Sequence, residues 1–251
     1  MQLDCYTGVH MQPAIVWSAP PTESTLAPEE ICIWKALLDR EPGFVRSLVE
    51  VLSPDERERA TRFHFARDRD RFIVGRGVLR ELLGAYLKSS PEGLHFRYGL
   101  QGKPALERDN RSPTICFNVS HTKGLALFAF ARGRRVGIDL EYIRADFKVE
   151  ELAQRYFSES EREELSALSA SSKAEAFFLC WTRKEAYIKA CGEGLHIDLK
   201  SFDVTLTPDQ PANFTGGVES RWQLNAFFAA DRCPAAVVYE GSPCSLRFLL
   251  Y

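Results

Sequence analysis

Apolar and polar residues alternate along residues 136–143, which is the pattern of a β-strand with two different faces. One face is aliphatic. The other carries the carboxylates of Asp139 and Glu141 behind Gly137, a residue that leaves room for a close approach to the backbone. Two carboxylates at this spacing repel each other by on the order of 2 kcal/mol at an effective dielectric of about 20. The pattern therefore indicates either a solvated edge or a crevice with a cation nearby.

Similar strand-like patterns recur along the chain. They predict strands at residues 14–17, 94–98, 115–119, 125–131, 202–206, 222–228, 235–239 and 246–250. The segments 115–119 and 125–131 are joined by a turn at 121–124 and predict a hairpin. In its first strand, Asn118 and Ser120 share the face opposite to the apolar one.

Two Ser-x-x-Glu capping boxes predict helix starts, one at Ser53 with proline in the first helical position and one at Ser158. Helical patterns then cover 54–63, 68–87 and 173–191, the last one ending at Gly192. Residues 29–38 are also interpreted as a short helix. These strands and capped helices together predict an α+β fold.

The two capping boxes belong to a weak internal repeat. Five residues of the first half recur at one constant offset in the second half: Ser53, Glu56, Arg57, Glu58 and Phe72 recur as Ser158, Glu161, Arg162, Glu163 and Phe177. We infer two similar halves, 1–134 and 135–251, related by a pseudo-two-fold axis. A site in the cleft between them would draw residues from both.

Composition narrows the class of protein. The 251 residues are 45% hydrophobic and 26% charged, and the formal net charge of −2 argues against a dedicated binder of nucleic acid or anionic membrane. The seven cysteines form no C-x-x-C pair, so we expect reduced thiols in a cytoplasmic setting. No signal-peptide pattern is evident at the N-terminus, and the longest uncharged apolar run, residues 125–131, is too short to cross a bilayer.

One side of the helix at 173–191 gathers candidate chemistry, because Phe177, Trp181, Glu185 and Lys189 are spaced by four residues. A plain surface pair of Glu185 with Lys189 would contribute only about 0.2–0.5 kcal/mol. If Glu185 instead faces inward, beside Asp139 and Glu141, the three carboxylates suit Mg²⁺. The five histidines are scattered, which disfavours a softer metal.

Groups suited to phosphate accompany these acids. Lys103 lies in a Gly-Lys-Pro turn, Ser120 and His121 end a strand, and Arg59 lies in the first capped helix. Lys184 and Lys189 flank Glu185. Each has an ordinary alternative as a solvated or structural side chain.

Four blocks together resemble the 4′-phosphopantetheinyl transferases of the surfactin-synthetase-activating type. They are Gly102-Lys103-Pro104, Asn118-Val119-Ser120-His121, residues 136–141 (VGIDLE) and residues 181–189 (WTRKEAYIK), in family order. The resemblance implies a monomer of two pseudo-symmetric halves that binds coenzyme A in the cleft between them. It also implies transfer of the phosphopantetheine arm to a serine of an apo acyl, peptidyl or aryl carrier protein, with release of adenosine 3′,5′-bisphosphate.

The resemblance also assigns roles to residues. Asp139, Glu185 and Glu141 would hold Mg²⁺ or Mn²⁺, and Asp139, Glu185 and Lys189 would carry the catalysis, with Lys189 on the diphosphate. Coenzyme A would be bound by these residues together with Arg59, Gly102, Lys103, Pro104, Asn118, Ser120, His121 and Lys184, and Arg59 and His121 would lie near its 3′-phosphate.

Two other functions are compatible with parts of the sequence. The same carboxylates could direct water and make a diphosphate hydrolase. The segment 57–80 holds eight arginines and could contact nucleic acid, although Glu58, Asp68 and Asp70 interleave them and indicate a helix surface laced with salt bridges.

Overall fold

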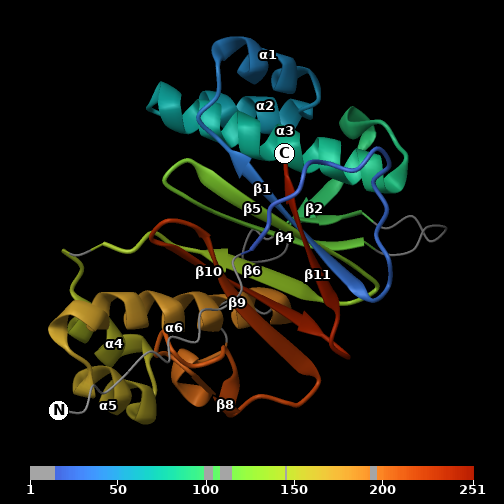
Figure 1. Cartoon of the computed structure of the whole chain (residues 1–251). Coiled ribbons are helices and arrows are strands. Elements are labelled where there is room, and N and C mark those ends of the chain that lie inside the picture. The colour runs from blue at the N-terminus through green and yellow to red at the C-terminus, as the bar shows by residue number, and fades with distance from the viewer. Residues whose placement is uncertain (1–14, 99–103, 108–114, 145, 193–196) are drawn as a thin grey trace, which may run out of the picture.

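The computed structural model describes residues 15–98, 104–107, 115–144, 146–192 and 197–251. Four layers follow one another: the helices α1–α3, a first sheet, a second sheet, and the helix α6 with α4 and α5 beside it (Figure 1). Among the described helices none is long and apolar enough to cross a membrane.

The helices are α1 (Pro42–Glu50), α2 (Pro54–Thr61), α3 (Ala66–Leu87), α4 (Val149–Tyr156), α5 (Glu159–Ala167) and α6 (Ala170–Cys191), with 3₁₀ turns at Pro91–Gly93 and Leu199–Ser201. The longer strands are β1 (Glu30–Leu37), β4 (Ile115–Thr122), β5 (Leu125–Arg132), β6 (Val136–Leu140), β9 (Trp222–Ala230), β10 (Cys233–Glu240) and β11 (Ser245–Leu250). The short strands are β2 (Phe96–Tyr98), β3 (Pro104–Leu106), β7 (Asp203–Val204) and β8 (Phe214–Gly216).

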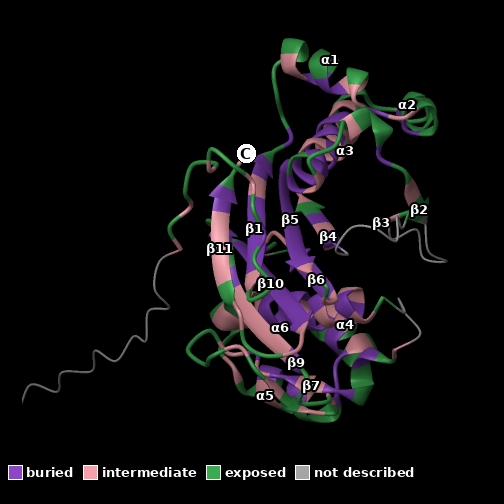
Figure 2. Cartoon of the chain, turned by 90° about the vertical axis from the view of Figure 1, so that its right-hand side faces the viewer, coloured by how far each residue is buried: buried purple, intermediate pink, exposed green. Residues whose placement is uncertain are grey.

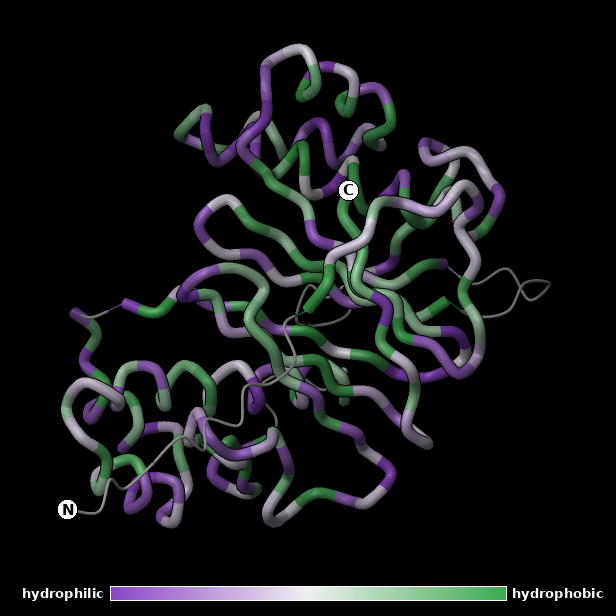
Figure 3. Tube along the Cα trace, in the orientation of Figure 1, coloured by the Kyte–Doolittle hydropathy of each residue, from purple (hydrophilic) through white to green (hydrophobic). Residues whose placement is uncertain are grey.

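Successive side chains of a strand point to opposite faces of its sheet, so each sheet packs against the layer on either side. The first sheet has the order β11-β1-β5-β4 and the second β6-β10-β9. On β5, Phe128 and Phe130 pack toward the helices α1–α3, whereas Leu127 and Ala129 pack between the sheets. The central strands are therefore buried on both faces (Figure 2) and apolar along much of their length (Figure 3).

Most of the predicted elements are confirmed, including the hairpin of β4 and β5, the two helices that follow the capping boxes, and the ends of α3 and α6. The interpretation of residues 29–38 as a helix was wrong, because this segment forms β1. β1 lies between β5 and β11 and is buried on both faces, with Ile31 facing the second sheet and Trp34 facing the helices. A strand buried on both sides reads as a nearly continuous apolar run, which periodicity does not distinguish from a helix.

The N-terminal end of the fold differs from expectation, whereas the strand predicted at 246–250 is confirmed as β11. The described residues of 14–17 form no strand, and only Ser18 makes an isolated bridge to Leu249. The last strand, β11, pairs in parallel with β1 of the first sheet. The division at residue 134 falls between β5 and β6 and remains a prediction.

The two capping boxes build the same kind of buried ion pair, each with a cation of a long helix. Glu56 is 1% exposed and accepts a hydrogen bond at 2.5 Å from Arg80 of α3. Glu161 is 2% exposed and lies 2.8 Å from the amine of Lys184 of α6. In each case the cation also donates to backbone carbonyls beyond its helix, which ties the long helix to the chain that follows.

We predict that Lys184→Met destabilises the fold, because Glu161 would stay buried without its counter-ion. Breaking a buried pair in this way costs about 3–5 kcal/mol in the free energy of unfolding. Urea denaturation followed by circular dichroism measures it. The matched control is Lys148→Met, since Lys148 pairs with Glu151 at the surface, where side chains are 80% and 71% exposed, and such pairs contribute about 0–1 kcal/mol. Equal midpoints for the two variants would contradict the prediction.

Candidate active site between the two sheets

The site depends on a close contact between α6 and β6. A Cβ atom at Gly137 would lie 2.2 Å from the carbonyl oxygen of Ala186 and 2.2 Å from the amide nitrogen of Ala190. Only glycine therefore fits at this position of β6, and the backbone of α6 lies directly on the strand. This contact brings Asp139, two residues further along β6, to the side of α6 that carries Glu185 and Lys189.

Asp139 is 4% exposed, and one of its oxygens is held by two donors. Its Oδ1 accepts a hydrogen bond from the Ser120 hydroxyl at 2.9 Å and a second one from the Lys189 amine at 2.6 Å. The Lys189 amine also donates to the Ser120 hydroxyl oxygen at 3.1 Å. Lys189 is therefore more than one half of a solvated Glu185–Lys189 pair on the helix surface, because it contacts Asp139 of β6.

Asn118 joins the two sheets at the same place. Its side-chain oxygen accepts a hydrogen bond at 2.8 Å from the backbone amide of Ile138, and Asn118 itself is buried. Asn118 and Ser120 face the same side of β4, as the alternation predicted. The side-chain oxygen of Asn118 therefore fixes the edge of β6 against β4.

An acidic cavity of about 620 Å³ opens at this junction. It is lined by the polar residues Asp139, Glu141, Glu185, Lys189, Ser120 and His121 and by Val119, Leu140, Tyr156, Trp181 and Leu199. Burial, followed by the charge of Asp139, raises the pKa of Glu185 to about 7. The same two causes raise the pKa of Glu141. The charge of Asp139 therefore opposes the ionisation of both Glu185 and Glu141.

The donor set fits a divalent cation with oxygen ligands. Asp139 Oδ2 is buried and has no hydrogen-bond partner among the described residues, and Glu141 and Glu185 line the same cavity, so a cation there would offset their negative charge. No three His, Cys, Asp or Glu side chains of the described part are already gathered around a common point. An ion would therefore draw its remaining ligands from water or substrate.

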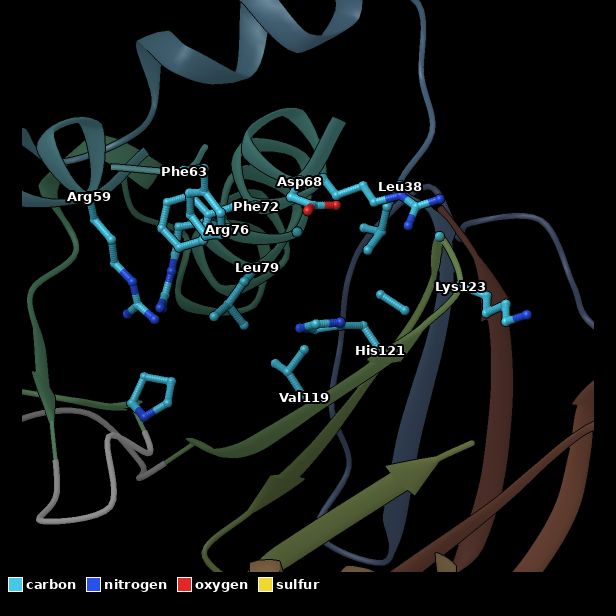
Figure 4. Close-up of a pocket in the computed structure, with 15 residues that line it drawn as sticks. Leu38, Arg59, Phe63, Asp68, Phe72, Arg76, Leu79, Val119, His121 and Lys123 are labelled. Atoms are coloured by element: carbon cyan, nitrogen blue, oxygen red, sulfur yellow. The ribbon is translucent and has the colours of Figure 1, made fainter. Parts of the chain in front are cut away.

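A second, basic cavity of about 490 Å³ adjoins the first and lies between α3 and the β4–β5 hairpin (Figure 4). Arg59 and Arg76 point into it side by side, and His121 approaches from β4. Arg59 lies over the ring of Phe72, with its guanidinium carbon 5.2 Å from the ring centroid. Val119 and His121 line both cavities, so the two spaces meet at the end of β4.

His121 stands where the two cavities meet. Burial lowers the pKa of its imidazole first, and the charges of Lys189 and Arg71 lower it further. A neutral ring at this point offers one donor and one acceptor, which suits a polar ligand that passes from one cavity into the other.

The remaining predicted site residues have different outcomes. Pro104 lines the basic cavity, whereas Gly102 and Lys103 lie outside the described residues. Lys184 needs a correction, because it is fully buried and its amine is bound by Glu161 and by the carbonyls of Leu199 and Phe202. It therefore supports the fold rather than lining either cavity.

Two arginines of the basic cavity were not singled out from the sequence. Arg71 engages Asp39 with two hydrogen bonds of 2.6 and 2.7 Å, and Arg76 lies 3.3 Å from Glu56. Arg71 and Arg76 both line the cavity from α3. The arginine-rich segment was the available signal, but only folding showed which arginines face inward.

Taken together, the fold and the site define a two-sheet α+β protein with a basic cavity next to an acidic one, an arrangement suited to a nucleotide with a diphosphate. The superfamily model of the 4′-phosphopantetheinyl transferases matches residues 135–238, and the model of the transferase N-terminal region matches residues 41–132.

Relatives of known name agree with these matches. The chain is 39% identical over 235 residues to the 4′-phosphopantetheinyl transferase HetI of Nostoc, covering 94% of this chain and 98% of that one. It is 30% identical to the Sfp transferase of Bacillus subtilis, covering 63% and 68%. A holo-(acyl-carrier-protein) synthase of Bacillus anthracis, solved with coenzyme A (3′,5′-ADP), is 22% identical with a TM-score of 0.35, covering 43% and 96%. The matched family models and the identity to HetI show that the chain belongs to the 4′-phosphopantetheinyl transferase superfamily.

We predict that Glu185→Gln becomes more stable relative to the unsubstituted protein as pH rises from about 4.5 to about 8 in metal-free buffer. Between these values the unfolded state holds Glu185 ionised, while the folded state keeps its proton up to a pKa of about 7, so stability falls as pH rises. Glutamine has no such proton to lose. Thermal midpoints with a chelator present measure the difference, and Glu163→Gln, at an exposed position of α5, is the control. A constant difference across the pH range would contradict the prediction.

Proposed function

We propose that this protein transfers the 4′-phosphopantetheine arm of coenzyme A to a serine of an apo carrier protein and releases adenosine 3′,5′-bisphosphate. The observation that supports this most directly is the meeting of a basic and an acidic cavity at His121, within a chain of the transferase superfamily. The basic cavity suits the phosphorylated nucleotide end. The acidic cavity suits the diphosphate with its cation.

In this proposal Arg59, Arg71 and His121 bind the nucleotide end, and Lys189 contacts the diphosphate. Asp139 and Glu185 would hold Mg²⁺, or Mn²⁺ in its place, with Glu141 as a third ligand. The bound ion would supply charge neutralisation for the diphosphate, which is the main requirement of phosphoryl-type transfer. The raised pKa of Glu141 and Glu185 agrees with this placement of charge.

The bonds that change are defined by the substrate. The oxygen of the carrier serine forms a bond to the phosphorus that carries the pantetheine arm, and the bond from that phosphorus to the bridging oxygen breaks. The bridging oxygen leaves with adenosine 3′,5′-bisphosphate. The serine proton needs an acceptor, and Glu185 is the candidate, either directly or through a water molecule. A carboxylate that binds a metal is a poorer proton acceptor, so we assign Glu185 first as a ligand.

We also propose that the protein works as a monomer in the cytoplasm. The six cysteines of the described part are free thiols, which is compatible with a reducing compartment.

The function is tested with purified protein, coenzyme A, MgCl₂ and a panel of apo carriers from fatty-acid, polyketide and nonribosomal-peptide synthesis. We expect the intact mass of at least one carrier to rise by one phosphopantetheine, and Asp139→Asn to lose this activity because it removes a ligand charge. Free phosphopantetheine with unmodified carriers would instead show a diphosphate hydrolase. If neither modified carrier nor free phosphopantetheine is formed, the proposal is refuted.

The role of Arg59 gives a separate prediction. Arg59→Ala should raise the KM for coenzyme A by about ten- to a hundredfold, as expected for the loss of a hydrogen bond to a charged group, and change kcat little. The KM for dephospho-coenzyme A, which lacks the 3′-phosphate, should change much less. Arg62→Ala is the control, since Arg62 is exposed on the same helix end and pairs with Glu58 at 2.5 Å. Equal losses for both substrates would contradict contact with the 3′-phosphate.

A further inference from the structure

The two oxygens of the Asp139 carboxylate have different surroundings. Oδ1 receives the Ser120 hydroxyl and the Lys189 amine, whereas Oδ2 is buried with no hydrogen-bond partner among the described residues. A buried carboxylate oxygen without a donor is costly, because burial removes it from water. Oδ2 lacks a donor although Oδ1 of the same carboxylate has two. This difference indicates that Oδ2 is the oxygen available to a ligand.

The Ser120 hydroxyl is used in a particular direction. It has one hydrogen, which it donates to Asp139 Oδ1, and its oxygen accepts from Lys189. Ser120 is 7% exposed and lies on β4, which Asn118 fixes against β6. The hydroxyl therefore stands on a rigid element and sets the rotation of the Asp139 carboxylate.

We propose that Ser120 is a positioning residue for a metal ligand: with Lys189 it holds Asp139 by Oδ1, so that Oδ2 is the oxygen presented to a divalent cation. The inference rests on the proposed function, which supplies the cation. It differs from the role that the family resemblance implied for Ser120, which was contact with coenzyme A.

The lining of the cavities favours positioning over contact with the nucleotide. Val119 and His121, the neighbours of Ser120, line both cavities. Ser120 lines the acidic cavity and is not among the described residues that line the basic one. Its hydroxyl is thus directed at the carboxylate cluster. Partners that orient a ligand in this way commonly change metal affinity by about 10–100-fold when they are removed.

The experiment separates the two roles by measuring two affinities. Mn²⁺ is titrated into protein that holds saturating coenzyme A, and electron paramagnetic resonance counts the free ion. The affinity for coenzyme A is measured separately by calorimetry in the presence of a chelator. We expect Ser120→Ala to weaken Mn²⁺ binding about tenfold or more and to leave the metal-free affinity for coenzyme A unchanged. Ser120→Cys, which keeps a weaker donor, should give an intermediate loss.

Thr122→Ala is the matched control, because it deletes a hydroxyl from the same face of β4 two residues further along. It should leave Mn²⁺ affinity unchanged, and circular dichroism checks the folding of every variant. The inference would be overturned if Ser120→Ala kept its Mn²⁺ affinity or lost only coenzyme A binding. The proposed function would still stand in that case, provided that the wild-type protein modifies a carrier. If the wild-type protein binds no Mn²⁺ and modifies no carrier, both the proposed function and the inference about Ser120 are refuted.

Discussion

The site depends on the absence of one side chain. Because Gly137 has no Cβ atom, the backbone of α6 rests on β6 with Ala186 and Ala190 against the strand. Any larger residue would push the helix outward, because a Cβ at 2.2 Å from backbone atoms leaves no room for adjustment. The separation of Asp139 from Glu185 and Lys189 is set by this contact, so the chemistry of the acidic cavity follows from a packing constraint.

That constraint creates an electrostatic problem which the fold solves only in part. Three carboxylates face one cavity, and the ammonium of Lys189 lies 2.6 Å from Asp139. Burial, followed by the charge of Asp139, raises the pKa values of Glu185 and Glu141. A site that is strained by like charges in the absence of a ligand binds a cation more strongly, because the cation relieves repulsion in addition to forming its own contacts.

Sequence reasoning succeeded where local pattern and spacing decide the structure. The alternation in β6 and the four-residue spacing on α6 placed Asp139 and Glu185 correctly at one cavity, and the glycine before Asp139 correctly indicated a close approach. It failed where burial on both faces erased the pattern, as in β1. It also missed Arg71, since eight arginines in one segment look alike until the helix is packed and the Asp39 carboxylate selects one of them.

The error at Lys184 has a geometric cause. Consecutive residues of a helix point about 100° apart, so Lys184 and Glu185 belong to different sides of α6 although they are neighbours in the sequence. Lys184 is directed at Glu161 of α5, in a buried ion pair like the one between Arg80 and Glu56. Glu185 is directed at the cavity beside β6. The pair of Lys184 with Glu161 thereby fixes the rotation of α6 one residue before Glu185. The side chain of Lys184, which the family resemblance assigned to coenzyme A, instead keeps Glu185 turned toward the cavity that Asp139 lines.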